Sequence, residues 1–82
     1  MVQAAQKVNV QELKILGLRI SETALTAEIS DGRVISIPTS WFSRLSNASI
    51  EKLEKFEISP AGYGIYWPEL DEDISIQSFI NP

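Results

Sequence analysis

The sequence has 82 residues and a formal net charge of −4, and it contains no cysteine and no histidine. A chain of this length is long enough for one domain and too short for two. Without Cys and His, disulfides, thiol nucleophiles, imidazole bases and the commonest zinc ligands are excluded. We therefore expect a protein that is not an enzyme and that uses no cofactor.

The charged residues are unevenly distributed. Residues 1–55 carry seven basic and six acidic side chains, whereas residues 56–82 carry five acidic side chains and no basic one. Nucleic-acid binding requires Lys and Arg side chains that neutralise phosphates, and no basic stripe is present, so we expect no direct contact with nucleic acid. No apolar run approaches a membrane span and no basic leader opens the chain, which predicts a cytoplasmic protein without membrane contact.

Residues 1–12 lack a sustained hydrophobic period, and we interpret them as an N-terminal arm that is loose or adds a short strand at Val8 and Val10. The single domain is expected over residues 13–82. Its first part alternates with period two, which is typical of half-buried strands. The alternation predicts two strands. One face of the first strand carries Leu16, Leu18 and Ile20, and one face of the second carries Leu25, Ala27 and Ile29.

Asp31-Gly32 separates the second strand from an alternating run over residues 34–37. A two-residue type I′ turn needs positive φ at both central positions, which Asp tolerates and Gly adopts freely. The pattern therefore predicts a two-residue hairpin at these positions. Pro38 cannot donate to a β-ladder, so we expect it to close the third strand.

Two short helices are predicted next. Thr39 is placed as an N-cap, and Trp41, Leu45 and Ala48 share one stripe of a helix that ends near Asn47.

The second helix is expected to be capped by Ser49, with Ile50, Leu53 and Phe56 facing inward.

The C-terminal part predicts two more strands, at residues 56–58 and 63–67, separated by a Pro60–Gly62 turn and ended by Pro68. A final helical turn is expected from Ile76, Phe79 and Ile80, with Ser75 as its cap and Ile74 packed on Phe79. The predicted class is α+β. Its antiparallel sheet combines the three-stranded meander with the C-terminal strands and is covered by two short helices.

Three polar patterns have simple structural explanations. Gly62-Tyr63-Gly64 is followed by a strand, not by the helix that a phosphate loop needs. The carboxylates at residues 69–73 lack the glycine and glutamate spacing of an EF-hand, which favours a solvated acidic loop without metal. The serines at positions 36, 40, 43 and 46 have no visible base, so nucleophilic catalysis is not expected.

The aromatic residues leave two alternatives open, a buried core or a surface that faces a partner. The candidate partner-binding residues are Trp41, Phe42, Tyr63, Tyr66 and Trp67, flanked by the carboxylates Glu69, Asp71 and Asp73. A core this small encloses two or three large rings, and the remainder must face solvent or another molecule. The neighbouring negative charge favours a basic protein partner.

Three segments together resemble the bacterial family known as domain of unknown function 2442. They are DGR at 31–33, IPTSWFSRL at 37–45 and GYGIYWPELDEDIS at 62–75, and the resemblance extends over residues 13–80. It implies a small α+β protein. Some family members are fused to a helix-turn-helix domain, and some are encoded beside another small family in arrangements suggestive of toxin and antitoxin pairs.

From these observations we expect a non-catalytic protein-interaction module of the antitoxin or regulatory kind. Its partner would be a small protein, such as the product of a neighbouring gene, or a second copy of the chain. One alternative is a subunit or sensor that binds a small ligand in a pocket lined by Trp41, Tyr66 and Trp67. Another is an enzyme that relies on carboxylates and a metal.

Overall fold

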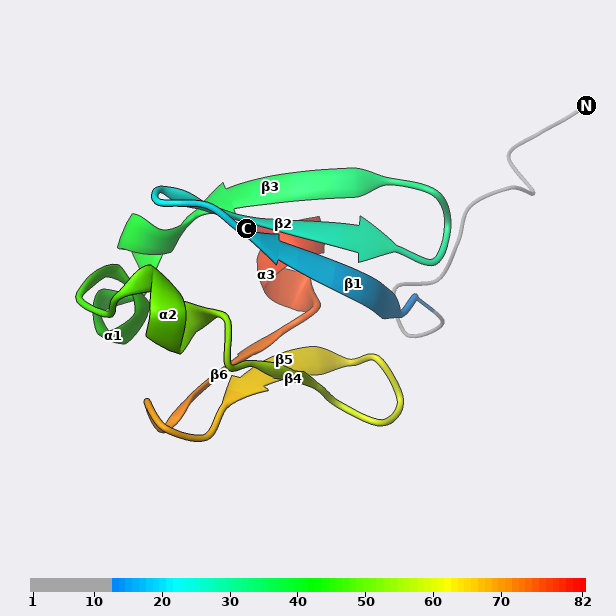
Figure 1. Cartoon of the computed structure of the whole chain (residues 1–82). Helices are drawn as coiled ribbons and strands as arrows, with labels where there is room; N and C mark the ends of the chain where they lie inside the picture. Colours follow the sequence, from blue (N-terminus) through cyan, green and yellow to red (C-terminus); the bar gives the residue numbers. More distant parts are fainter. Residues whose placement is uncertain (1–12) are drawn as a thin grey trace, which may run out of the picture.

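The computed structural model describes residues 13–82, and it consists of two three-stranded antiparallel sheets with short helices (Figure 1). The predicted arm at residues 1–12, with its strand at Val8 and Val10, lies outside the described residues. The first sheet has the order β1 (Ile15–Ile20), β2 (Ala24–Ile29) and β3 (Val34–Pro38), and the second has the order β4 (Glu57–Ile58), β5 (Gly64–Trp67) and β6 (Glu72–Ser75). The α+β class is confirmed, but the C-terminal strands form a sheet of their own and do not extend the first one.

The helical segments lie at one end of the sheets and between them. They are the 3-10 turn η3 (Thr39–Trp41) and the helices α1 (Ser43–Ser46), α2 (Ile50–Leu53) and α3 (Gln77–Ile80). In Figure 1, α1 and α2 lie together at one end of the molecule, and α3 contacts both β3 and β6. The helices therefore cover parts of the core that the two sheets leave open.

A β-bulge in β1 changes which residues of this strand face the core. Ile15 pairs with Ile29 and Gly17 pairs with Glu28, so Leu16 is an extra residue in β1. Ile15 is consequently buried, and Leu16 is 64% exposed. The prediction that Leu16 shares the inner face with the later residues of β1 is wrong, because a bulge shifts the alternation by one residue.

The β2–β3 hairpin forms where the sequence predicts it, but with a different turn. The N–H of Gly32 donates to the carbonyl oxygen of Ile29 at 2.9 Å, and the N–H of Ile29 donates to that of Arg33 at 2.8 Å. Gly32 has φ of 99°, whereas Asp31 is not in the positive-φ region. The loop therefore has three residues with one left-handed glycine, and the predicted two-residue type I′ turn is wrong.

The Asp31 side chain stabilises this loop from outside. Its carboxylate accepts from the N–H of Arg33 at 3.1 Å and from the Nε of Arg33 at 2.8 Å. The hydrogen bond from the backbone N–H, with the guanidinium beside it, lowers the pKa of Asp31 below its ordinary value. Asp31 thus serves the turn as an acceptor and as a member of an ion pair.

The predicted helix after Pro38 is broken into two pieces. Thr39 is buried inside η3 and is not an N-cap, since Pro38 holds that position. Phe42, with φ of −126°, interrupts the helical backbone between η3 and α1. Because of this break Leu45 is buried while Trp41 is exposed, so the predicted common stripe does not include Trp41.

Helix α2 matches its prediction more closely. The Ser49 hydroxyl accepts from the N–H of Lys52 at 3.2 Å, which confirms Ser49 as the N-cap. Leu53 is buried as predicted, and Phe56 packs partly buried against the core. Ile50 is exposed, in contrast to its predicted inward position.

The hydrophobic core is built around Trp67, which is fully buried. Its indole Nε1 donates to the carbonyl oxygen of Leu53 at 2.9 Å, and its ring centroid lies 6.5 Å from that of Phe56. This contact ties β5 to the end of α2. The other buried hydrophobic residues are Leu13, Ile15, Leu25, Ala27, Ile29, Ile37, Leu45, Leu53, Ile65, Ile74, Ile76 and Phe79.

The two sheets meet at the loop between β4 and β5. The N–H of Ile15, at the start of β1, donates to the carbonyl oxygen of Gly62 at 2.8 Å. Gly62 has φ of 75°, and a Cβ at this position would lie 2.8 Å from the Cβ of Lys14. Only glycine satisfies both the backbone conformation and the close approach of β1.

The C-terminal residues form a strand and a helical turn. Strand β6 was not predicted, whereas the helical turn was, and Phe79 is buried in it. The Ser75 hydroxyl accepts from the N–H of Gln77 at 3.1 Å, although Ile76 occupies the N-cap position.

Candidate functional site

Three large aromatic side chains are exposed on the part of the chain that the structure describes. They are Trp41 at 52%, Tyr63 at 57% and Tyr66 at 42%. Phe42 is half-buried against the core. The structure removes Trp67 from the predicted partner-facing set, because its ring is enclosed and its only polar atom is already hydrogen-bonded.

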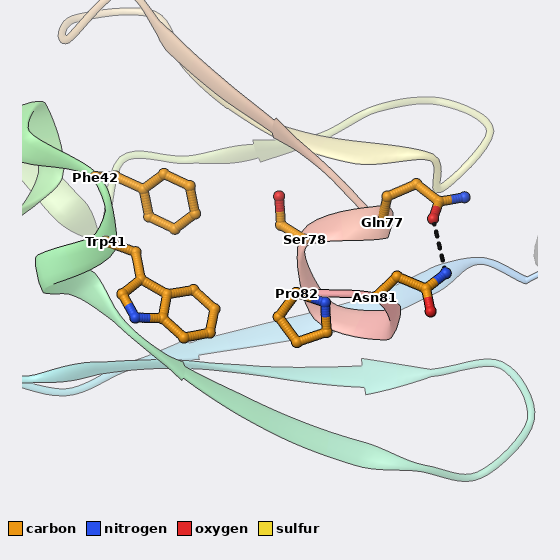
Figure 2. Close-up of a pocket in the computed structure, with 6 residues that line it drawn as sticks. All are labelled: Trp41, Phe42, Gln77, Ser78, Asn81 and Pro82. Atoms are coloured by element: carbon orange, nitrogen blue, oxygen red, sulfur yellow. Dashed lines mark hydrogen bonds between the residues drawn. The ribbon is translucent and has the colours of Figure 1, made fainter.

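Trp41 and Phe42 line a hollow of about 270 Å³ beside α3, which we call the Trp41 hollow. Figure 2 shows the two rings pointing from the η3 segment toward α3, whose residues form the opposite wall. That wall includes Gln77 and Asn81, joined by a 3.2 Å hydrogen bond from the Asn81 amide nitrogen to the Gln77 side-chain oxygen. A hollow with two aromatic rings in one wall suits an apolar side chain of another molecule.

A second hollow, of about 340 Å³, lies on the outer face of the second sheet. We call this surface the Tyr66 face. Its lining residues are Ser59, Tyr63, Gly64, Ile65, Tyr66, Asp73, Ile74 and Ser75. A Cβ on Gly64 would lie 2.6 Å from the carbonyl oxygen of Ile74, so glycine is required for β5 and β6 to approach here.

The strand register places Tyr66 between two carboxylates. Tyr66 pairs with Glu57 on β4 and with Asp73 on β6. All three side chains are exposed, whereas their neighbours along the strands, Ile65 and Ile74, are buried. Directly opposed residues of an antiparallel pair have Cβ atoms about 5 Å apart, so Glu57 and Asp73 flank Tyr66 across the strands.

Two other acidic residues, Glu69 and Asp71, form ion pairs within the chain. Lys55 Nζ lies 3.6 Å from Glu69 Oε2, and Arg44 Nη1 lies 3.7 Å from Asp71 Oδ2. Arg44 Nη1 also donates to the backbone oxygen of Asp71 at 2.6 Å, beside the positive φ of 51° at Asp71. These exposed ion pairs offset the negative charges of Glu69 and Asp71. Asp73, by contrast, forms no ion pair within residues 13–82.

The predicted site residues are therefore not brought together into one surface. Trp41 and Phe42 line one hollow, Tyr63 and Tyr66 line another, and the two hollows share no lining residue. The predicted acidic loop ends at Asp71, because Glu72 and Asp73 belong to β6.

Sequence reasoning missed Gly64 and the α3 wall as parts of the two hollows, and it missed Glu57 as the neighbour of Tyr66 across the sheet. Tyr66 and Trp67 are adjacent in the sequence but lie on opposite faces of β5, one exposed and one buried. The neighbour of Tyr66 on β4, however, depends on strand register, which the sequence does not specify for a two-residue strand.

Residues 13–82 contain neither a metal-binding cluster nor a membrane-spanning helix. Within this range, no group of three or more carboxylates gathers in a way that could hold a metal ion. None of the helices in the same range has the length and apolar character that crossing a bilayer requires.

Fold and surface together define a small α+β domain in which two three-stranded meanders enclose one core. The chain belongs to the family described as Protein of unknown function (DUF2442), whose model matches residues 17–82. The resemblance seen in the sequence is thereby confirmed. No match is found among curated proteins.

Two solved structures share the fold. A protein of unknown function from Rhodospirillum rubrum is 26% identical, with a TM-score of 0.72, and the match covers 82% of this chain and 83% of that one. An uncharacterized protein from Chromobacterium violaceum is 23% identical, with a TM-score of 0.68, and the match covers 82% of this chain and 63% of that one. These likenesses concern the fold.

Proposed function

We propose that this protein is a non-catalytic interaction module of the antitoxin or regulatory kind, which binds a small protein partner. The observation that carries the proposal is the exposure of Trp41, Tyr63 and Tyr66 at two surface hollows. Trp and Tyr are the residues most enriched among those that dominate binding energy at protein interfaces. Their exposure in so small a domain is better explained by a partner than by folding, because the core is complete without them.

A small-ligand sensor is less well supported by the geometry. Such a sensor was expected to have one pocket lined by Trp41, Tyr66 and Trp67. Trp67 is fully buried, and the other two side chains line separate open hollows. Open, shallow hollows suit the side chains of a protein better than the enclosure of a small molecule.

The proposal is tested by coexpression of the protein with the product of its neighbouring gene, followed by size-exclusion chromatography and calorimetry of the purified pair. We expect a complex that Trp41→Ala or Tyr66→Ala weakens by at least about thirtyfold, as interface aromatics of this kind do.

The matched control is Leu16→Ala, which removes an exposed apolar side chain that lines neither hollow. It should leave the affinity unchanged. Absence of a complex, or equal loss of affinity in all three variants, would contradict the proposal.

A further inference from the structure

We propose that the Tyr66 face binds the cationic side chains, arginine or lysine, of a basic segment of the partner protein. This inference rests on the proposed function and assigns a chemistry to one of the two hollows. It depends on the residues that the strand register brings to the outer face of the second sheet.

The outer face consists of two rows across the sheet. The first row is Glu57, Tyr66 and Asp73, from the register of β4, β5 and β6. The second row lies two residues along the strands and pairs Gly64 with Ser75, with Ser59 next to Gly64 through a 3.0 Å backbone hydrogen bond. The first row is therefore aromatic and acidic, and the second is made of the smallest side chains.

The small row forms the floor of the hollow. Its hydroxyl groups already have partners: Ser59 Oγ accepts from the N–H of Tyr63 at 2.9 Å, and Ser75 Oγ accepts from the N–H of Gln77 at 3.1 Å. The strongest acceptors left to recognise a ligand are the carboxylates of the first row, together with the tyrosine hydroxyls. This composition favours a cation, because carboxylates only accept hydrogen bonds and repel anions.

The shape of the hollow fits a long cationic side chain. An aliphatic stem lying over the Gly64 floor would contact the rings of Tyr63 and Tyr66, which both line the hollow. Its charged group would then reach the row in which Tyr66 separates two carboxylates. Guanidinium groups stack on aromatic rings and bind carboxylates through parallel N–H groups, so arginine uses both features at once.

Charge complementarity supports this occupant. The segment from residue 56 to residue 82 contains five acidic residues and no basic one. Glu69 and Asp71 are paired with Lys55 and Arg44, whereas within residues 13–82 neither Glu57 nor Asp73 lies within ion-pair distance of a basic group. The carboxylates beside Tyr66 are thus available to a basic partner, as is Glu72, which precedes Asp73 in β6.

The test uses the full chain and a short acetylated, amidated peptide that alternates glycine with arginine. The control peptide carries citrulline, which has the shape of arginine without its charge. Amide chemical shifts are followed by NMR at low ionic strength. We expect saturable shifts at Tyr66, Gly64 and Asp73 with the arginine peptide, none with the citrulline peptide, and weakening as salt is added.

Two double variants separate the proposed site from general electrostatic attraction. The first double variant combines Glu57→Gln with Asp73→Asn, on either side of Tyr66. The second combines Glu69→Gln with Asp71→Asn, which changes the net charge equally but does not flank Tyr66. We expect the first pair to weaken peptide binding about three- to tenfold and the second to leave it nearly unchanged. Tyr66→Ala should weaken it about two- to fivefold.

Equal weakening by both double variants would show non-specific attraction and overturn the inference, as would the absence of binding. Self-association of the protein that Tyr66→Ala abolishes would overturn it too, by making the face a contact between copies. Each of these results leaves the proposed function standing if the partner still requires Trp41. Loss of the partner complex with intact peptide binding would refute the proposed function alone.

Discussion

Alanine in place of Gly62 should destabilise the protein much more than alanine in place of Gly32. Both glycines have positive φ, 75° and 99°, so both substitutions place a Cβ in the left-handed region. That conformation costs about 1–2 kcal/mol, of which the reduced freedom of the unfolded chain returns about 0.4–1 kcal/mol. Gly32→Ala should therefore lower the free energy of unfolding by about 1 kcal/mol, since no atom lies within 4 Å of its new Cβ.

Gly62 adds a steric cost at the junction of the two sheets. Its new Cβ would lie 2.8 Å from Lys14 Cβ and 3.2 Å from the backbone nitrogen of Ile15, which must also keep its hydrogen bond to Gly62. Overpacking of this kind costs about 1–3 kcal/mol, so Gly62→Ala should lower the free energy of unfolding by about 2–4 kcal/mol in total.

Urea unfolding followed by far-UV circular dichroism measures both changes, with the slope against urea checked for constancy. NMR spectra should show shifts that reach the start of β1 in the Gly62 variant and stay near the turn in the Gly32 variant. Equal losses of stability in the two variants would refute the packing of β1 against the β4–β5 loop.

Three other substitutions or conditions test the remaining contacts. Trp67→Phe should lower the free energy of unfolding by about 1–3 kcal/mol in urea titrations, because the buried carbonyl oxygen of Leu53 loses its donor; an unchanged midpoint would contradict that hydrogen bond. The pKa of Asp31 is lowered in the folded state, so its contribution is present above the unfolded pKa of about 4 and lost as pH falls through the folded pKa. The difference in urea midpoint between wild type and Asp31→Asn should therefore shrink in acid. A difference that grows in acid would mean that the pKa of Asp31 is raised in the folded state. Calcium, magnesium or manganese at millimolar concentration should leave the melting temperature nearly unchanged, whereas saturable stabilisation lost in Asp71→Asn with Asp73→Asn would reveal a metal site.

Local patterns in the sequence predicted much of the fold. The hairpin around Gly32, the cap at Ser49 and the buried helical turn at Phe79 all follow from residue chemistry within a few positions. The bulge at Leu16 could not be predicted this way, because an alternating strand with one extra residue has the same composition as one without it.

The candidate surface was harder to predict than the fold. The sequence identifies the aromatic residues but not which of them are buried, since Trp41 and Trp67 differ only in their tertiary surroundings. Strand β6 was missed because two of its four residues are carboxylates, which are depleted in strands. Their pairing with β5 is nevertheless what places Asp73 beside Tyr66.

The division into two meanders also bears on how the chain folds. Within residues 13–82, strands pair only with their neighbours in sequence, so each sheet can form from contacts that are close in sequence. The bond between Ile15 and Gly62, by contrast, closes a loop that contains most of the domain and joins the halves. We therefore expect the halves to dock late in folding, so that Gly62→Ala should speed unfolding more than it slows folding.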